Sequence, residues 1–250
     1  MMWLNPPHNF IVSEEVVHVW RADLEVDESS QRSFLKLLAP DEESRAGKFR
    51  FAKDRRNFIA ARGMLRVLLG KYLETNPAEI SFEYSRFGKP GIANSNALRF
   101  NITHSQNIAL FAFTKKFTIG IDVEFVNPDI EVKDIAKKFF STNEIMNLLA
   151  LPVKQQALGF FNCWTRKEAF IKAVGEGLSF PLDKFEVSLE PGKPAKLLAT
   201  HWEPAAVSKW SMYSMSPEPN FVGSLVIEGL VEEVAFWNWQ MSYLPFTDLI

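Results

Sequence analysis

The two halves of this 250-residue sequence predict the same order of helices and strands, and this repetition limits the fold more than any other feature. Apolar spacing in the first half predicts a strand, two helices, a long helix and a further strand over residues 16–24, 30–38, 41–51, 53–72 and 80–84. The second half predicts the same series over residues 117–124, 132–140, 142–149, 155–174 and 185–189. We therefore expect an internal duplication with its boundary near residue 116, in an α/β (α+β) fold of two similar lobes.

A shared string gives this duplication modest support. The two long helices contain the string FIxAxG at residues 58–63 and 170–175, and the leading strands, HVWRADL and IGIDVEF, stand at corresponding places. So short a string can arise by chance, and the agreement in element order therefore carries the inference. The rest of the sequence predicts a Gly/Pro turn and five further strands, over residues 87–92, 98–104, 109–114, 210–215, 221–227 and 234–239.

Composition narrows the class of protein. Hydrophobic residues make up 47% and charged residues 23%, as in ordinary globular proteins, and a net charge of -2 argues against a protein that wraps nucleic acid. The single cysteine, Cys163, excludes a disulfide within the chain and favours a reducing compartment. The first ten residues lack a signal-peptide pattern, and no apolar run approaches the roughly 18 residues of a membrane span. We expect a cytoplasmic protein.

Two carboxylates are predicted to share one face of the strand over residues 117–124. Because side chains alternate along a strand, Gly120, Asp122 and Glu124 point to one side and the apolar residues between them point to the other. The two carboxylates are then separated by roughly 6–7 Å along the strand, and both can approach one cation. Gly120 is expected to leave space beside them.

A third carboxylate is predicted on the long helix of the second half. Phe161, Trp164, Glu168 and Ile171 follow the spacing of one helix face, which places Glu168 on an apolar stripe. A buried carboxylate is too costly to remain ionised without a cation or a proton. Lys172, one turn later, can supply that cation, and so can a metal ion shared with the two strand carboxylates.

Each of these motifs taken singly is more often a solvated surface feature. A helical Glu–Lys pair contributes only a few tenths of a kcal/mol at a surface, and paired carboxylates commonly line a hydrated strand. Their combination favours a site, because three carboxylates together with water and phosphate oxygens suit Mg²⁺, and Mn²⁺ accepts the same ligands. No His/Cys cluster predicts zinc, and no Gly-rich phosphate loop or dinucleotide fingerprint is present.

Basic residues are concentrated between residues 45 and 71, where the only acid is Asp54. This excess is compatible with a solvated helix face, a nucleic-acid patch or a site for a polyphosphate ligand. Strand alternation places His104 toward the core, where a lone histidine is usually structural, although the following turn can bring it to a sheet edge beside the acids. The basic residues are Arg45, Lys48, Arg50, Lys53, Arg55, Arg56, Arg62, Arg66 and Lys71.

Four motifs stand out along the chain: GKP at residues 88–90, FNITHS at 100–105, IGIDVE at 119–124 and WTRKEAFIK at 164–172. Together they resemble the motifs of the Sfp-type 4'-phosphopantetheinyl transferases. The resemblance extends over about residues 45–189, and the set is specific because the motifs agree in both order and spacing. It implies a pseudo-twofold fold with the coenzyme A side in residues 1–116, the metal and catalytic residues in 117–250, and the active site between the lobes.

The resemblance also implies a division of roles. Asp122, Glu124 and Glu168 would hold Mg²⁺ against the coenzyme A pyrophosphate, and Glu168 would be the base toward a carrier serine, directly or through a metal-bound water. Lys172 would stabilise or protonate the departing phosphate, and His104 would take part in catalysis. The residues expected to contact coenzyme A are Arg45, Arg56, Arg62, Lys89, Pro90, Thr103, His104, Asp122 and Lys172.

Two residues depart from the family pattern. Glu42 stands where some members have a second phosphate-binding basic residue, which leaves the contacts to the 3'-phosphate open. Gln106 stands where a small residue is common, which affects nothing central.

The implied reaction is transfer of 4'-phosphopantetheine from coenzyme A to a serine of an apo acyl or peptidyl carrier protein. Adenosine 3',5'-bisphosphate would be released. The partners would then be a carrier protein and coenzyme A, without nucleic acid or membrane, and a duplicated chain can complete its site as a monomer. Two competing interpretations are a Mg²⁺-dependent nuclease or phosphodiesterase, and a non-catalytic homologue that binds coenzyme A or a carrier.

Overall fold

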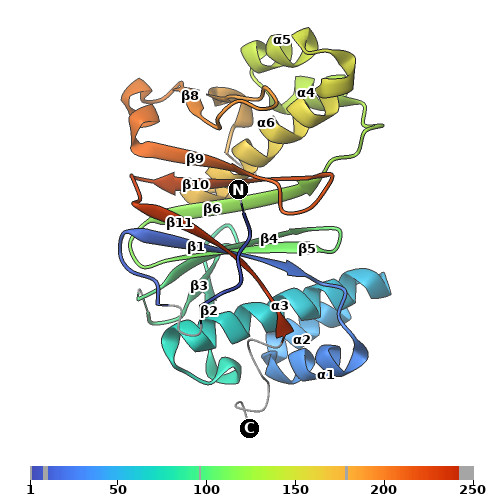
Figure 1. Ribbon diagram of the computed structural model, residues 1–250, viewed down its shortest axis with the longest axis vertical. Helices are drawn as coiled ribbons and strands as arrows, with labels where there is room; N and C mark the ends of the chain where they lie inside the picture. The colour runs from blue at the N-terminus through green and yellow to red at the C-terminus, as the bar shows by residue number, and fades with distance from the viewer. Residues whose placement is uncertain (1, 8–10, 96, 178–179, 242–250) are drawn as a thin grey trace.

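The computed structural model of this protein describes residues 2–7, 11–95, 97–177 and 180–241. Figure 1 shows four layers, in which two sheets lie face to face and each is covered on its outer side by helices. The helices are α1 (Glu28–Leu37), α2 (Pro40–Gly47), α3 (Ala52–Leu73), α4 (Val132–Phe139), α5 (Thr142–Ala150) and α6 (Val153–Val174). The mixed two-lobed fold confirms the fold class that the sequence predicts. Within the described ranges, no helix is both long and apolar enough to cross a membrane.

The strands form two main sheets and two short hairpins. The first sheet has the order β11-β1-β5-β4, the second has the order β6-β10-β9, and the hairpins are β2–β3 and β7–β8. All neighbours are antiparallel except β1 and β11, which are parallel. The strands are β1 (Val16–Asp23), β2 (Phe82–Tyr84), β3 (Pro90–Ile92), β4 (Arg99–Ser105), β5 (Ile108–Thr114), β6 (Thr118–Phe125), β7 (Phe185–Val187), β8 (Leu197–Thr200), β9 (Trp210–Met215), β10 (Phe221–Glu228) and β11 (Glu233–Asn238).

The lobes repeat one order of elements. Each has a leading strand, two short helices, a long helix, a 3-10 helix, a short hairpin and two further strands. The shared string FIxAxG is not part of this correspondence. Residue 58 lies six residues after the start of α3, whereas residue 170 lies seventeen residues after the start of α6. The match between the strings is therefore coincidental, because equivalent positions of the two helices differ by about three helical turns in the string alignment.

A buried ion pair holds the long helix of the first lobe. Glu42, in the first turn of α2, accepts a hydrogen bond from the backbone N–H of Ala39 and pairs with Arg66 Nε at 2.7 Å. Arg66 also donates to the backbone oxygens of Pro77 at 2.8 Å and Ile80 at 2.9 Å. The pair therefore ties α2 and α3 to the 3-10 helix that precedes β2.

The second lobe contains an equivalent ion pair. Glu144, in the first turn of α5, accepts from the backbone N–H of Ser141 and pairs with Lys167 Nζ at 2.8 Å. Lys167 donates to the backbone oxygens of Leu182 and Phe185, both at 2.6 Å. The same contacts therefore pin both long helices to the segments before the short hairpins, although one lobe uses arginine and the other lysine.

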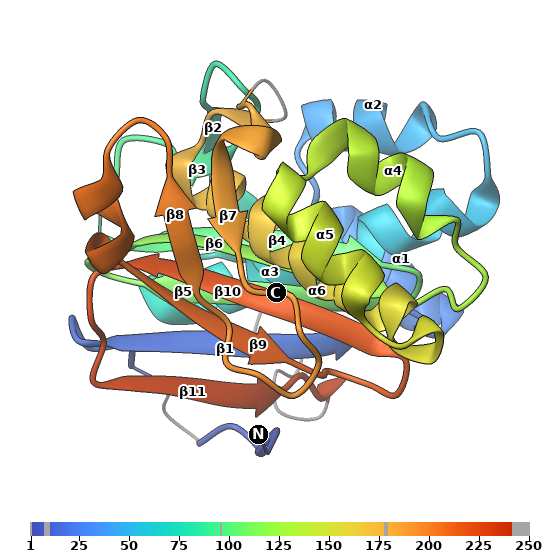
Figure 2. The same cartoon turned by 90° about the horizontal axis from the view of Figure 1, so that it is seen from above.

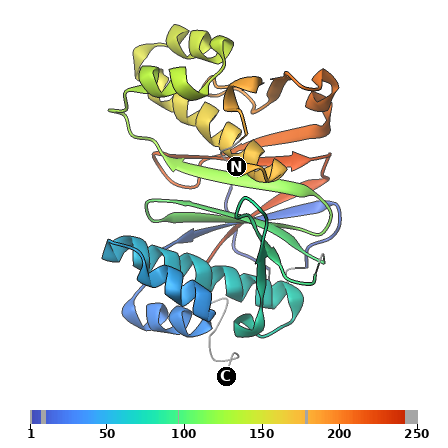
Figure 3. The same cartoon turned by 180° about the vertical axis from the view of Figure 1, so that it is seen from behind.

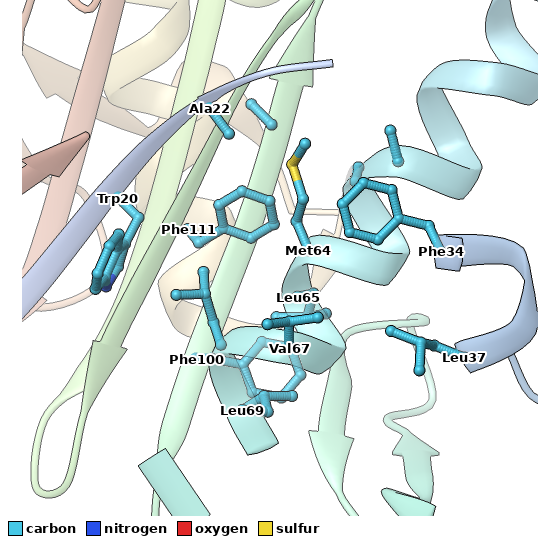
Figure 4. Close-up of a cluster of buried hydrophobic side chains, with 14 of the residues drawn as sticks. Trp20, Ala22, Phe34, Leu37, Met64, Leu65, Val67, Leu69, Phe100 and Phe111 are labelled. Carbon is cyan, nitrogen blue, oxygen red and sulfur yellow. The ribbon is translucent and has the colours of Figure 1, made fainter. Parts of the chain in front are cut away.

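Three apolar cores lie between the layers. The first packs α1 and α3 on the first sheet, the second lies between the sheets, and the third packs α4–α6 on the second sheet. Figure 4 shows Phe34 of α1 and Met64 of α3 directed toward Phe111 in the first core. Gly63 permits this approach, because a Cβ atom there would lie 2.3 Å from Phe34 Cδ1.

Three sequence predictions differ from the structure. The helix predicted over 41–51 ends at Gly47, and residues 48–51 lead instead into α3. The segment predicted only as a turn over 87–92 contains β3, because pairing with β2 overrides the local turn preference of Pro90 and Gly91. Strand β8 was not predicted, since its four residues carry little periodicity.

The end of the chain returns to the first lobe. Strand β11, which the sequence division at residue 116 assigns to the second lobe, pairs in parallel with β1 from Val16↔Glu233 to Arg21↔Asn238. Figure 2 shows β11 beside β1, at the edge of the first sheet. The first sheet therefore contains strands from both halves of the sequence.

A candidate active site between the lobes

Strand β6 brings two carboxylates toward helix α6. Gly120, Asp122 and Glu124 lie on the face of β6 opposite Ile119, Ile121 and Val123, whose side chains are buried between the sheets. The alternation predicted from the sequence is therefore confirmed. The space expected beside Gly120 is filled by α6, since an added Cβ atom would lie 2.0 Å from the Ala169 oxygen and 2.3 Å from the Ala173 nitrogen.

Asp122 is the most buried acid of the site, with 4% of its surface exposed. Its Oδ1 accepts from Lys172 Nζ at 2.6 Å and from Thr103 Oγ1 at 3.0 Å. Its Oδ2 is buried and has no hydrogen-bond partner among the described residues. Burial pushes the pKa of Asp122 upward, and the Lys172 ammonium opposes that shift.

Glu124 is held at the end of β6 by a residue of the first lobe. Its Oε2 accepts from Ser105 Oγ at 2.9 Å, and Ser105 Oγ in turn accepts from the backbone N–H of Phe125 at 3.1 Å. Burial, and next the negative charge of Asp122, raise the pKa of Glu124. Ser105 therefore orients a carboxylate that the sequence singled out, although the sequence assigned Ser105 no role of its own.

Glu168 joins these acids from helix α6. Its carboxyl group is half-buried, and its pKa is raised to about 7 by burial and then by the charge of Asp122, while Lys172 opposes the shift. The charge of Glu124 adds to the increase. Asp122, Glu124 and Glu168, here called the carboxylate cluster, thus all interact electrostatically with the ammonium of Lys172, which contacts Asp122 directly.

The oxygen atoms of the carboxylate cluster are candidate ligands for a divalent cation. Within the described ranges, no group of three or more His, Cys, Asp and Glu side chains is already arranged as metal ligands. The charge distribution nevertheless suits a cation, because three neighbouring carboxyl groups have raised pKa values and Asp122 Oδ2 is buried without a partner in the described part of the chain. Oxygen ligands of this kind fit Mg²⁺ or Mn²⁺.

A cavity of about 310 Å³, here called the interlobe cavity, opens beside Lys172 and Thr103. Its volume lies at the lower end of the roughly 300–1,000 Å³ typical of small-molecule sites. Residues from both lobes line it, and they include several that the sequence assigned to coenzyme A: Arg45, Arg62, Pro90, Thr103, His104 and Lys172.

Arg62 reaches the interlobe cavity while paired to a buried acid. Its Nε donates to Glu42, its Nη2 donates to the Tyr84 hydroxyl at 2.6 Å, and its guanidinium lies 4.0 Å from the Phe82 ring centroid. Glu42, the departure from the family pattern, is thus a structural anchor with 2% of its surface exposed. Tyr84 is a cavity residue that sequence reasoning missed, because it contacts Arg62 only through the fold.

Of the two positions that the sequence allowed for His104, the structure shows the one at the sheet edge and not the one in the core. His104 shares a face of β4 with the buried Phe100, but it lies at the end of the strand, beyond the core, and is exposed. Partial desolvation, and next the Lys172 ammonium, lower the pKa of His104. The neutral ring can therefore serve as a hydrogen-bonding group toward the interlobe cavity.

Three residues that the resemblance assigns to coenzyme A do not themselves line the interlobe cavity: Arg56, Asp122 and Lys89, although Gly88 and Pro90 on either side of Lys89 do. Arg56 lines a separate cavity of about 280 Å³ beside Lys53 and Asn57. Lys89 lines a cavity of about 380 Å³ next to the β2–β3 hairpin, and its ammonium is bonded to two backbone oxygens. The basic residues at 45–71 therefore do not form one site. Arg62 is buried and paired with Glu42, whereas Arg56 is exposed at the surface.

Comparison with known proteins gives concordant matches in both lobes. Residues 118–226 match the family described as the 4'-phosphopantetheinyl transferase superfamily, and residues 25–116 match the N-terminal region of 4'-phosphopantetheinyl transferases. The chain is 38% identical to 4'-phosphopantetheinyl transferase HetI of Nostoc sp., over 95% of this chain and 98% of HetI. It is 32% identical to 4'-phosphopantetheinyl transferase Sfp of Bacillus subtilis, over 67% and 73% of the two chains. It is 31% identical to 4'-phosphopantetheinyl transferase psf-1 of Bacillus pumilus, over 75% and 81%.

Proposed function

This chain belongs to the 4'-phosphopantetheinyl transferase superfamily, and from that premise we propose how its residues carry out the reaction. The enzyme transfers the 4'-phosphopantetheine group from coenzyme A to a serine of an apo-carrier protein and releases adenosine 3',5'-bisphosphate. The observation that carries the residue assignment is the ion pair between Asp122 and Lys172, which lies between the carboxylate cluster and the interlobe cavity.

The chemistry calls for a base and for groups that stabilise charge on phosphate oxygens. A serine hydroxyl attacks phosphorus and the pyrophosphate linkage breaks, so negative charge builds on the departing phosphate. Glu168 is the proposed base, because its carboxyl group, with a pKa raised to about 7 in the metal-free protein, can accept the serine proton in its ionised form. Lys172 is the proposed electrostatic stabiliser of the departing phosphate, to which its ammonium can also give a proton.

Coenzyme A is proposed to bind in the interlobe cavity. Arg45 is exposed on its wall and is the proposed partner of the 3'-phosphate, with Arg62 beside it. Thr103 and His104 lie at the junction with the carboxylate cluster and are proposed to contact the pyrophosphate. Pro90 forms part of the wall toward the nucleotide.

Mg²⁺, or Mn²⁺ in its place, is proposed to bind at the carboxylate cluster. Asp122, Glu124 and Glu168 would hold it, and when bound it would neutralise charge on the pyrophosphate. Support comes from the raised pKa values of the three carboxyl groups and from the buried, unpartnered Oδ2 of Asp122 in the described part of the chain. In its absence, Lys172 supplies the positive charge beside Asp122.

We further propose that the protein is a cytoplasmic monomer. Its partners are acyl or peptidyl carrier proteins, and not nucleic acids or membranes. The buried free thiol of Cys163 suits a reducing compartment. The proposed site draws on both lobes of a single chain, so it needs no second copy.

The substitution Glu168→Gln tests the assignment of the base. We expect it to abolish labelling of an apo-carrier incubated with Mg²⁺ and coenzyme A, as followed by the mass of the intact carrier, because the amide cannot accept the serine proton. Glu176→Gln, at an exposed position beyond the end of α6, is the matched control and should label normally. Near-normal labelling by the Glu168 variant, with an unchanged melting temperature, would remove Glu168 from this role.

The same incubation separates the two competing functions. A nuclease or phosphodiesterase would cleave DNA or RNA with strongly salt-sensitive binding and would leave the carrier unlabelled. A non-catalytic homologue would bind coenzyme A or the carrier without joining them. Only a transferase produces a covalently labelled carrier together with free adenosine 3',5'-bisphosphate.

A further inference from the structure

Strand β6, which carries Asp122 and Glu124, has one edge that no strand covers in the described part of the chain. It pairs with β10 on one side only, and β4 of the first lobe lies next to its other side without forming a ladder. Figure 3 shows this junction from behind, where the two sheets meet. Backbone groups at a bare, buried edge must find other partners, because leaving them unpaired is costly.

Lys89 supplies one of these partners from the turn before β3. Its Nζ donates to the backbone oxygen of Ile119 in β6 at 3.1 Å and to that of Ala173 in α6 at 3.2 Å. Ala173 lies in the last turn of α6, where carbonyl groups lack helical partners and a positive charge is favourable. One ammonium therefore joins the first lobe to both elements that carry the catalytic groups.

The stem of Lys89 and its turn also pack on the end of α6. The helix ends at Gly175, and a Cβ atom built there would lie 3.7 Å from Lys89 Cδ. At Gly177 a Cβ atom would lie 3.3 Å from Cβ of Phe87, in the same turn as Lys89. The turn thus covers the segment that follows Lys172, which limits how far the last turn of α6 can move.

A second side chain of the first lobe also bonds to a backbone group at this edge of β6. Asn101 of β4 is 4% exposed, and its Oδ1 accepts from the backbone N–H of Ile121 at 2.8 Å. Ile119 and Ile121 precede and follow Gly120 in β6, so Lys89 and Asn101 bond to the backbone on either side of Gly120. Together with Ser105, which accepts from the backbone N–H of Phe125, they supply side-chain partners to backbone groups of β6 that no strand pairs in the described part of the chain.

We propose that Lys89 is a positioning residue for the transfer reaction, holding β6 and the last turn of α6 together so that Asp122 and Lys172 meet. In this role it does not contact a phosphate of coenzyme A. The proposal rests on the transferase activity proposed above, and it replaces the ligand contact that the family resemblance implies for Lys89.

Further observations describe the surroundings of the Lys89 ammonium. Lys89 lines the 380 Å³ cavity, whereas Arg45, His104 and Lys172 line the interlobe cavity, which Lys89 adjoins through its neighbours Gly88 and Pro90. Burial, and next the charge of Arg99, lower the pKa of Lys89 to about 8, which reports that its ammonium is largely shielded from water. Two of its three donors are already used within the protein.

Lys89→Met tests the proposal, because methionine keeps most of the stem and removes the ammonium. Three measurements are needed: kcat and KM for coenzyme A, direct binding of coenzyme A by calorimetry, and amide hydrogen exchange of residues 171–177 in the ligand-free protein. Lys115→Met, in the exposed turn between β5 and β6, is the matched control. Lys89→Arg, which keeps the charge and the donors, and Asn101→Ala, which leaves Lys89 intact, are the companion variants.

We expect Lys89→Met to lower kcat by about 10-fold or more, since displacements of about 1 Å at a site are costly. Its affinity for coenzyme A should stay within about 3-fold of the wild type, and exchange should accelerate at the end of α6. Lys89→Arg should recover part of kcat and of the exchange protection, and Asn101→Ala should lower kcat in the same sense.

A loss of coenzyme A affinity of about 10-fold or more, with kcat and exchange unchanged, would overturn the proposal and return Lys89 to a ligand role. Should Lys89→Met fail to fold, Lys89→Arg and Asn101→Ala provide the same comparison. Failure of the proposed function would show differently, as a wild-type protein that labels no carrier. The exchange measurement would still decide the position of Lys89, because it requires no activity.

Discussion

Replacing Gly120 with alanine would force helix α6 away from strand β6. The added Cβ would lie 2.0 Å from the Ala169 oxygen, 2.3 Å from the Ala173 nitrogen and 3.0 Å from the Ala173 Cα. Ordinary contact of a Cβ atom begins near 3.4 Å, so the closest pair must separate by about 1.4 Å. All three atoms belong to the backbone, and no side-chain rotation can relieve the contact.

The expected cost falls on both stability and catalysis. Overpacking typically costs about 1–3 kcal/mol, and displacement of backbone puts Gly120→Ala at or above the upper end of that range. Because α6 carries Glu168 and Lys172, the same displacement lengthens the 2.6 Å contact between Lys172 and Asp122. A misplacement of about 1 Å can lower turnover by about 100-fold.

Urea unfolding and carrier-labelling kinetics measure the two effects of Gly120→Ala. Gly47→Ala is the control, since an added Cβ at the end of α2 meets no atom within 4 Å. The control should unfold and turn over as the wild type does. Wild-type stability and kcat in the Gly120 variant would refute the close contact between β6 and α6, and with it the reasoning that glycine is required there.

Three further outcomes are expected. Burial lowers the pKa of His18 from 6.5 to about 4, so protonation of His18 favours the unfolded chain. The stability that neutral His18 contributes is complete above about pH 6.5 and is lost as the pH falls toward 4. Urea titrations should show a loss of up to about 3 kcal/mol over this range. His18→Gln should flatten that dependence, and an unchanged slope would contradict the assignment. Lys167→Met leaves Glu144 buried without its cation and should lower the free energy of unfolding by about 3 kcal/mol or more; a change below about 1 kcal/mol would show the pair to be unimportant. Arg45→Ala should raise KM for coenzyme A about 10-fold, whereas Arg56→Ala, in its separate cavity, should leave it unchanged, and equal effects would refute the placement of the nucleotide.

The basic segment shows why composition alone could not identify the ligand site. Arg62 and Arg66 are paired with Glu42, which stands some twenty residues earlier in the chain, and Arg56 lines another cavity. Arg45 is the member of the segment that reaches the interlobe cavity with no acid paired to it among the described residues. A local excess of charge is a property of the sequence, whereas its neutralisation depends on contacts made by the fold.

The sequence by itself determined the features that follow from local periodicity. A strand period of two places Asp122 and Glu124 on one face, and helical spacing places Glu168 and Lys172 one turn apart. Element order likewise indicated two similar lobes, although the shared string FIxAxG lies at unequal positions in α3 and α6.

Tertiary structure decided everything that depends on which surfaces meet. It paired Lys172 with Asp122, brought His104 to the surface, and placed the ammonium of Lys89 against backbone oxygens of β6 and α6. These contacts join residues far apart in the chain, whose approach is set by how the helices and sheets pack. Local periodicity reports which face a side chain occupies, and only packing determines what that face meets.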